Sequence, residues 1–338
     1  MTEPVHEARA PWRGVPDFFI VGHAKCGTTA LYEMLKSHPQ IYMPERKEPW
    51  FFACEHPHPR RRHGRAWTTL DQTGTRAETF EEYLSLFKAT KADQRVGEAS
   101  THYLWSLTAP RRIAQARPDA RIIAILREPA SFLRSLHLQL SQNRHETESD
   151  FRQAIDLEDD RRAGRRIPNH STWPACLLYS DRVRYVDQLR RYHAVFPPDQ
   201  VLVLIYDDFR DDNEGSVRRV LRFLDVKDTF AVEAVEANPT VAVRSARLDT
   251  VSHAAFTGRG PVWGAVKTGV RTITPRRWRG DVGRSLRSIR ERVVYSEPKP
   301  PDEDFMLELR RRFKGEIVAL SEYLDRDLIT LWDYDRLD

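Results

Sequence analysis

A short stretch near the start of the chain has the residue types that bind a phosphate group. It reads GHAKCGTT, with Lys25 ahead of Gly27 and then Thr28 and Thr29. Unpaired backbone N–H groups at a helix N-terminus attract anions, and glycine permits the tight turn that aims them. The lysine adds a positive charge and the threonines add hydroxyl donors. The stretch therefore predicts an anion site where a helix begins.

The same stretch departs from the ATP-binding loop G-x-x-x-x-G-K-[ST] at one position. Thr28 stands where that loop has lysine, and the lysine of this chain comes three residues earlier. This departure disfavours an ordinary nucleoside triphosphatase but keeps the expectation of a phosphate-type anion. Cys26 lies within the turn, so its backbone belongs to the predicted site. The alternative interpretation is a tight strand–helix turn with a solvated Lys25.

A second candidate anion site follows the apolar run RIIAIL. Arg127 comes directly after this run, and Ser135 lies eight residues further on, about two helical turns along. The carboxyl end of a strand is where open α/β sheets bind ligands, and the planar fork of arginine suits a phosphate dianion. The alternative interpretation is a helix start at which Arg127 caps or pairs at the surface.

The two sites together resemble those of the sulfotransferases that use 3′-phosphoadenylyl sulfate (PAPS). Their phosphosulfate loop has the form K-x-G-T-[TR] after a strand that ends in glycine. The resemblance implies a 5′-phosphosulfate loop formed by Lys25, Cys26, Gly27, Thr28 and Thr29. It also implies that Arg127 and Ser135 hold the 3′-phosphate.

The segment KEPWFF at 47–52 resembles the K/N-E-x-H-F-F segment of the heparan-type and related bacterial sulfotransferases. In that family the glutamate deprotonates the acceptor hydroxyl, so the resemblance makes Glu48 the candidate general base. The aromatic side chains beside it should partly desolvate the carboxylate and raise its pKa. Trp50 stands where relatives often carry histidine. The alternative interpretation is that Glu48 pairs with Lys47 or Arg46.

Other residues compete for the role of base or depart from the family pattern. His137 is the main rival of Glu48, and His102 and His23 are weaker rivals. The segment GEASTHYL at 97–104 resembles the family pattern G-E-K-[ST]-P-x-Y-L, but Ala99 replaces the lysine and Thr101 the proline. Its glutamate, Glu98, is a candidate acceptor-side or structural carboxylate.

The resemblance implies transfer of a sulfonate group from PAPS to a hydroxyl of a carbohydrate, a lipid or another small molecule. Lys25 would neutralise the charge that develops on the bridging oxygen, and Glu48 would accept the proton. The chemistry parallels phosphoryl transfer, but fixed cations replace Mg²⁺. The residues include no cluster with metal-ligand spacing, so we expect no metal.

The elements that must position these residues alternate between strands and helices. Three apolar runs have the length and composition of buried strands, at 17–22, 121–126 and 201–206, and RVGEAS at 95–100 reads as a short strand or strand end. Helical patterns lie between and after them, at 29–38, 79–87, 108–117, 127–142, 180–196, 213–226 and 300–324. This order predicts an α/β fold with a central parallel sheet covered on both faces. The resemblance implies the three-layer α/β/α, P-loop NTPase-like sulfotransferase fold.

The alternation of strands and helices also predicts the domain organisation. Residues 1–16 read as a flexible N-terminal arm, and residues 17–338 as a single sulfotransferase domain. Strands and helices no longer alternate over 225–300, and we expect this segment to be a lid or insertion. The Lys-Gly-Arg loop that closes over the nucleotide in many relatives is not evident; Arg244-Ser245 and the basic stretch 276–279 are its candidate replacements.

The composition of the chain excludes several classes of protein. The chain has 338 residues, 40% of them hydrophobic, and a formal net charge of +5. No run approaches the roughly 20 apolar residues of a membrane span. The three cysteines lack CxxC spacing, and the N-terminus lacks a secretory signal, so we expect a cytoplasmic protein. No nucleic-acid motif is present, and the sequence leaves the oligomeric state open.

The sequence leaves two other function classes open. The segment VLVLIYDDF at 201–209 resembles a Walker B strand, which is compatible with a kinase or NTPase that has a divergent phosphate loop. A non-catalytic nucleotide-binding protein of the same fold is the second class. Residues 261–280 mix apolar and basic side chains and allow weak contact with a membrane surface; a solvated basic loop is the alternative interpretation.

Overall fold

The computed structural model describes residues 14–53, 77, 79–169, 171, 173–229, 242–243 and 295–337. These residues fall into two compact units. The first is drawn from Met1–Leu133, Leu178–Asn238 and Asp304–Asp338, and the second from Arg134–Leu177 and Pro239–Glu303. Several predicted features lie outside the described residues: residues 1–13 of the arm, most of the insertion at 225–300, Arg244-Ser245, the stretch 276–279 and the membrane candidate 261–280.

A five-stranded parallel sheet forms the centre of the first unit. Its strands are β1 (Phe18–Ile20), β2 (Ile41–Tyr42), β3 (Arg95–Ala99), β4 (Arg121–Leu126) and β5 (Val201–Ile205), in the order β2-β3-β1-β4-β5. All four pairings are parallel. Every residue of β1 is buried, as are five of the six in β4. These central strands are continuous apolar runs because helices cover both of their faces.

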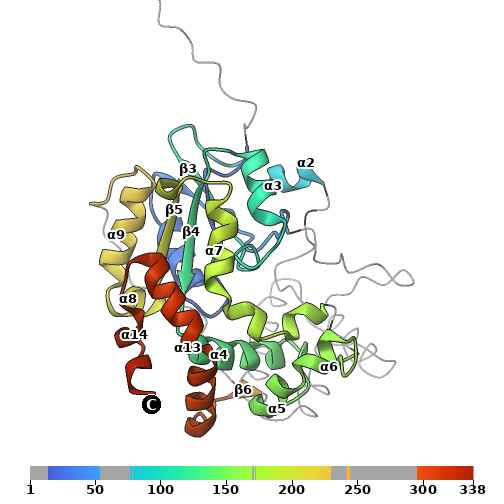
Figure 1. The fold of residues 1–338 in the computed structure, drawn as a ribbon. Coiled ribbons are helices and arrows are strands. Elements are labelled where there is room, and N and C mark those ends of the chain that lie inside the picture. The colour runs from blue at the N-terminus through green and yellow to red at the C-terminus, as the bar shows by residue number, and fades with distance from the viewer. Residues whose placement is uncertain are drawn as a thin grey trace, which may run out of the picture. The chain divides into compact units, whose positions relative to one another are not determined.

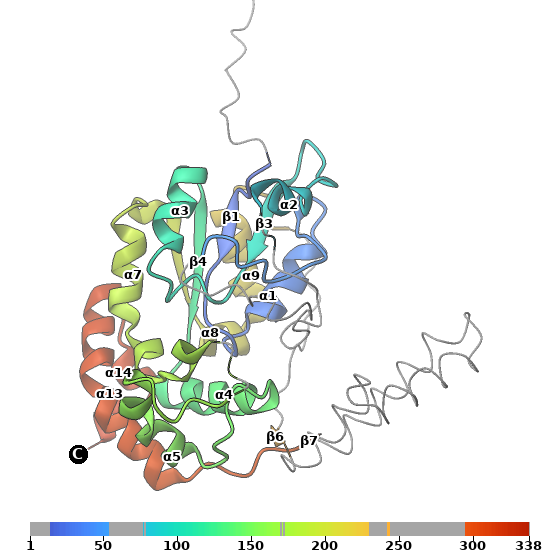
Figure 2. The ribbon, with the colours of Figure 1, turned by 90° about the vertical axis from the view of Figure 1, so that its right-hand side faces the viewer.

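Helices cover the two faces of this sheet. Figure 2 shows α3 (Ala109–Ala116), α7 (Tyr185–His193) and α13 (Glu303–Leu324) on one face, and α1 (Thr28–Lys36) and α9 (Asn213–Phe223) on the other. Across the sheet, the chain moves in one direction from β1 to β2 and in the opposite direction from β3 to β4 and on to β5. Because parallel crossovers are right-handed, α1 lies on one face of the sheet, and α3 and α7 lie on the other. The predicted three-layer α/β/α fold is confirmed.

Gly22 lets the end of β1 approach β4 closely. A Cβ atom at this position would lie 2.7 Å from the backbone nitrogen of Ile125, a separation that backbone atoms cannot relieve. The backbone N–H of Val21 donates to the carbonyl of Ile123 at 2.9 Å, which extends the β1–β4 pairing past the strand. The two strands therefore present their carboxyl ends at one edge of the sheet.

Some elements differ from the sequence prediction. The predicted helix over 180–196 is a 3₁₀ turn at Ser180–Val183 followed by α7, because the backbone at Arg184 leaves the helical region with ψ at 64°. The predicted strand 201–206 ends at Ile205, and Tyr206 already begins α8 (Tyr206–Asp211). The two-residue strand β2 is too short for alternation or an apolar run to predict it.

The C-terminal part of the first unit is helical. After α13 come α14 (Leu328–Leu331) and a 3₁₀ turn at Tyr334–Arg336, coloured red in Figure 1. Leu309, Ile317 and Leu320 of α13 are almost fully buried. Among the described residues, no helix combines the length and the apolar character that a membrane crossing needs.

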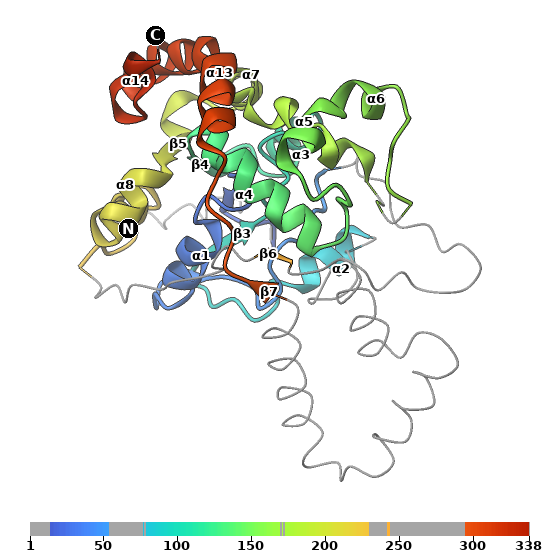
Figure 3. The same ribbon diagram turned by 90° about the horizontal axis from the view of Figure 1, so that it is seen from below.

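The second unit is built around a buried ion pair. It holds most of α4 (Pro129–Gln142), with α5 (Phe151–Asp156), α6 (Glu158–Arg162), a 3₁₀ turn at Pro174–Leu177, and the short antiparallel pair β6 (Ala242–Val243) and β7 (Tyr295–Ser296) seen in Figure 3. Arg161 pairs with Glu146 at 2.8 Å, and both side chains are at most 1% exposed. Removing one partner of such a pair would leave a buried charge uncompensated.

Candidate functional site

The loop after β1 turns sharply into α1, as the glycine spacing predicts. Gly27 is the N-cap residue with φ at 81°, and Lys25 also has a positive φ, at 64°. The first helical hydrogen bond runs from the N–H of Leu31 to the carbonyl of Gly27 at 3.0 Å. Since Gly27 supplies no side-chain cap, the first N–H groups of α1 have the orientation that suits an anion.

Packing as well as conformation requires glycine at position 27. A Cβ atom there would lie 2.9 Å from Cδ1 of Phe209 and 3.4 Å from Cδ2 of Tyr206, both in α8. The side chain of Cys26 is fully buried, so only its backbone is available to a ligand. Thr28 and Thr29 form the first turn of α1. This arrangement is the one expected of a phosphate-binding loop.

Arg127 lies beside this loop. It follows β4, and its Nη1 donates to the backbone carbonyl of Lys25 at 2.9 Å. The guanidinium lies over the ring of Tyr206, 4.7 Å from its centroid, and the hydroxyl of Tyr185 donates to the Arg127 carbonyl at 2.8 Å. Burial and then the Arg127 charge lower the pKa of Lys25. The two cationic residues predicted from separate motifs therefore meet at one edge of the sheet.

The segment that carries Glu48 is tied to the end of β3. The N–H of Glu48 donates to the Ala99 carbonyl at 2.9 Å, and the N–H of Trp50 donates to Oγ of Ser100 at 3.2 Å. Glu48 and Trp50 have positive φ angles of 63° and 52°, a conformation that costs non-glycine residues of order 1 kcal/mol. Strained backbone held by neighbouring structure is common at functional sites.

Four side chains converge on the carboxylate of Glu48. Oγ1 of Thr101 lies 3.1 and 3.0 Å from its two oxygens, and Nε1 of Trp50 donates to Oε2 at 2.6 Å. Nζ of Lys47 donates to Oε1 at 3.4 Å, and Nδ1 of His102 lies 3.7 Å from Oε2. The residues at 50 and 101 that depart from the family pattern are thus direct partners of the candidate base.

These partners reverse the expected pKa shift of Glu48. Burial does raise the pKa, as the neighbouring aromatic residues predict, but the charge of Lys47, the nearby His102 and the hydrogen bond from Trp50 outweigh it. The pKa of Glu48 lies well below its usual range. The expectation of a raised pKa is therefore wrong: the indole of Trp50 contributes a hydrogen-bond donor as well as an apolar surface.

Lys47 is a residue whose role the sequence interpretation missed. The sequence predicts at most a pair between Lys47 and Glu48. Its Nζ also donates to Oγ1 of Thr29 at 3.0 Å and to Oγ1 of Thr28 at 3.4 Å. Lys47 thus links the phosphate-type loop to the candidate base. The KE dipeptide was the available signal, but spacing alone does not show which way its lysine points.

Glu98 is the buried carboxyl group behind this site. It is fully buried in β3 and accepts hydrogen bonds from Tyr83 Oη and Ser100 Oγ, both at 2.6 Å, and from Tyr103 Oη at 3.3 Å. Burial raises its pKa to about 7, although these hydrogen bonds lower it. Because Ser100 in turn accepts from the Trp50 N–H, Glu98 supports the segment that carries Glu48.

Two of the three rival histidines, His23 and His137, have structural partners, whereas His102 lies beside Glu48. Nε2 of His23 lies 2.9 Å from Oε1 of Gln188, and its ring packs on Phe132. Nε2 of His137 lies 2.8 Å from the carbonyl of Glu148 in the second unit. Ser135 is buried and also belongs to the second unit, so its convergence with Arg127 on one phosphate stays a prediction.

The two acidic residues of the Walker B-like segment hold the C-terminal helices. Oδ2 of Asp207 accepts from Nε1 of Trp332 at 2.8 Å. Asp208 accepts two hydrogen bonds from Arg326, at 2.5 and 2.6 Å. These contacts give both carboxylates a structural role and do not favour the kinase or NTPase alternative.

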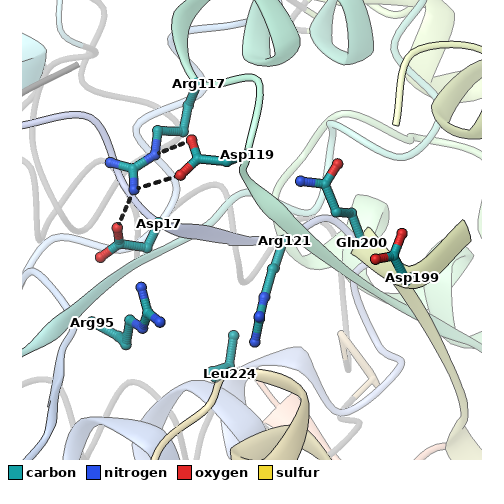
Figure 4. Close-up of a pocket in the computed structure, with 8 residues that line it drawn as sticks. All are labelled: Asp17, Arg95, Arg117, Asp119, Arg121, Asp199, Gln200 and Leu224. Carbon is teal, nitrogen blue, oxygen red and sulfur yellow. Dashed lines mark hydrogen bonds and ion pairs between the residues drawn. The ribbon is translucent and has the colours of Figure 1, made fainter. Parts of the chain in front are cut away.

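A charged pocket lies at the opposite, amino-terminal edge of the sheet. Its volume is about 260 Å³, and Figure 4 shows the eight residues that line it. Arg117 pairs there with Asp17 at 2.6 Å and with Asp119 at 2.7 Å, and Arg121 pairs with Asp225. Because its arginines are matched by aspartates, this pocket is an ion-pair network between strand ends and not a second anion site.

The burial of Cys26 has a testable chemical consequence. Burial raises the pKa of its thiol to about 12, so almost none of it is the reactive thiolate at pH 8. We expect iodoacetamide to leave Cys26 unmodified in the folded protein and to modify it in urea, as measured by peptide mass spectrometry. Rapid labelling of Cys26 under native conditions would contradict the buried placement.

Comparisons with known proteins agree with this geometry. The profile of the sulfotransferase family matches residues 16–229, more than half of the chain. A sulfotransferase of solved structure from Alicyclobacillus acidocaldarius is 31% identical, with a TM-score of 0.55 over 70% of this chain and 90% of that one.

Two curated relatives are more distant. The rat carbohydrate sulfotransferase 15 is 26% identical over 66% of this chain and 46% of its own length. The human bifunctional heparan sulfate N-deacetylase/N-sulfotransferase 3 is 28% identical over 63% of this chain and 22% of its own length. The chain therefore spans at most about half the length of these relatives. The family match, the fold and the loop geometry lead to one conclusion: the chain belongs to the sulfotransferase family.

Proposed function

We propose that this protein transfers a sulfonate group from PAPS to a hydroxyl group of a carbohydrate, a lipid or another small molecule. The observation that carries the proposal is the meeting of Lys25, Arg127 and Glu48 at the carboxyl edge of one sheet, through the Arg127–Lys25 and Lys47–Thr29 hydrogen bonds. The names of the curated relatives support a carbohydrate acceptor.

The residues of the loop suit the 5′ end of this donor. The N–H groups of the first turn of α1, with the hydroxyls of Thr28 and Thr29, would hold the 5′-phosphate. Lys25 would stabilise the negative charge that develops on the bridging oxygen. Arg127, together with Ser135, would hold the 3′-phosphate, for which the planar guanidinium is well suited.

The reaction is an in-line displacement. The acceptor oxygen forms a bond to sulfur while the bond from sulfur to the bridging oxygen breaks, and its electron pair stays on the departing phosphate. The acceptor proton passes to Glu48. The protein supplies position and charge compensation, as in phosphoryl transfer.

The test compares ligands and then turnover. We expect adenosine 3′,5′-bisphosphate (PAP), the desulfated donor, to raise the melting temperature in a thermal-shift assay, because a ligand that binds only the folded state stabilises it. Mg-ATP at the same concentration should not. Radiolabelled PAPS should then label an acceptor from a panel of desulfated heparin, chondroitin, a glycolipid and 2-naphthol. Stabilisation by Mg-ATP alone would instead support the kinase or NTPase alternative.

A further inference from the structure

Lys47 occupies the place where the phosphate-type loop and the candidate base meet. Its Nζ lies 3.0 Å from Oγ1 of Thr29, 3.4 Å from Oγ1 of Thr28 and 3.4 Å from Oε1 of Glu48. Its side chain is only 15% exposed, against 25% for Glu48. Lys47 therefore contacts both the loop threonines and the carboxylate of the candidate base.

We propose that Lys47 is a further catalytic residue, which binds the sulfonate of the donor and thereby leaves Glu48 available as a base. The inference rests on the proposed function. A single ammonium group has a limited number of donors, and two anions compete for it here. Without donor, the carboxylate of Glu48 is the anionic partner of Lys47. With donor bound, the sulfonate takes that place, beside the loop threonines that Lys47 already contacts.

The charges around Glu48 explain why this exchange matters. The groups that face it are Lys47 from its own segment, His102 and Thr101 after β3, the Trp50 indole, and Glu98 within β3. Lys47 is the first of the causes that lower the Glu48 pKa, and burial lowers the pKa of His102, which favours its neutral form. When Lys47 turns to the sulfonate, the largest opposing charge is withdrawn and burial raises the pKa of Glu48.

The same movement serves the transfer itself. As the sulfur leaves the bridging oxygen and approaches the acceptor oxygen, its three other oxygens keep a negative charge that Lys47 can stabilise throughout. Lys25 stabilises the departing phosphate oxygen, and Glu48 receives the acceptor proton. One lysine therefore serves the leaving group and the other serves the transferred group.

The first experiment measures binding and needs no acceptor. PAPS and PAP are titrated by calorimetry into the wild-type protein, Lys47→Met, Lys47→Arg and the control Lys36→Met, which removes an exposed lysine at the end of α1. We expect Lys47→Met to weaken PAPS about 10- to 100-fold, the effect of one charge-assisted hydrogen bond, and PAP less than about threefold. Lys47→Arg should recover most of the PAPS affinity, and Lys36→Met should match the wild type.

The second experiment follows the proton. Titrations of PAPS at pH 5 in buffers of different ionisation enthalpy give the number of protons taken up on binding. We expect the wild type to take up more protons than Glu48→Gln, because donor binding raises the pKa of Glu48. The ligand's own titration cancels in this difference. Lys47→Met should take up no more than Glu48→Gln, because in that variant no ammonium group leaves the carboxylate.

The outcomes separate the two proposals. If the wild type binds neither PAPS nor PAP, the proposed function is wrong. If it binds both, and Lys47→Met keeps the wild-type ratio of PAPS to PAP affinity, the function stands and the role of Lys47 is overturned. This includes an equal loss of affinity for both ligands, since Lys47 would then act on the bisphosphate or on the fold.

Discussion

Replacing Lys25 with methionine should lower the rate of sulfonate transfer by about 10³-fold. The residue lies in the turn before α1, its backbone carbonyl is held by Arg127, and its positive φ of 64° fixes the direction in which the side chain leaves the loop. Removing one fixed donor to a developing negative charge typically costs 10²- to 10³-fold, and here a full charge is removed as well. Transfer of labelled sulfonate from PAPS at saturating donor measures the effect.

The pKa of Lys25 adds a pH dependence to this prediction. Burial and Arg127 lower the pKa below that of an ordinary lysine. The ammonium form is therefore lost at a lower pH than usual, and we expect wild-type activity to decline on the alkaline side below the ordinary lysine range. A Lys25→Arg variant, which stays charged, should lack this decline even if its activity is low.

A matched lysine controls for the loss of charge. Lys36 ends the same helix, and its side chain is exposed. Lys36→Met should keep transfer within about twofold, as surface substitutions usually do. Activity of Lys25→Met within tenfold of the wild type would remove Lys25 from the catalytic site, whatever the outcome for Arg127.

The parts of the fold that could be predicted are those with strong local signals. The apolar runs at β1, β4 and β5 have the length and the β-branched composition of buried strands, and the glycine at 27 marks the turn into α1. The short helices α5 and α6 lie in a highly charged segment, where a cap at Asp150, which accepts from the N–H of Gln153 at 2.9 Å, was the main signal. Their apolar faces are too short to show a helical period.

The site could be predicted as a set of residues but not as a set of contacts. Lys25 and Arg127 follow strands, so topology alone brings them to one edge. The position of Lys47 depends on positive φ angles at Glu48 and Trp50, residues that seldom adopt this conformation. No glycine marks the turn, and the contacts that hold it come from Ala99 and Ser100, some 50 residues away in the sequence.

Replacing Glu48 with glutamine should lower kcat by at least about 10²-fold, a usual effect of removing a general base. The amide keeps an oxygen that can accept from Thr101 and Trp50, so the segment should stay in place and the affinity for PAP should remain within about threefold. Glu45→Gln, an exposed position three residues upstream, is the matched control and should behave as the wild type. A loss smaller than tenfold in Glu48→Gln would assign the base to another residue.

The pH dependence of kcat/KM gives a second test of Glu48 as the base. The pKa of Glu48 in the free protein lies below its usual range because Lys47, His102 and Trp50 outweigh burial, so the carboxylate stays ionised as the pH falls. The acid limb of kcat/KM reports the free enzyme, and we expect it below the ordinary glutamate range near pH 4. A carboxylate with so low a pKa is a weak base, so it needs help at the moment of transfer. An acid limb near pH 6.5 that persists in Glu48→Gln would show that a histidine, and not Glu48, accepts the proton.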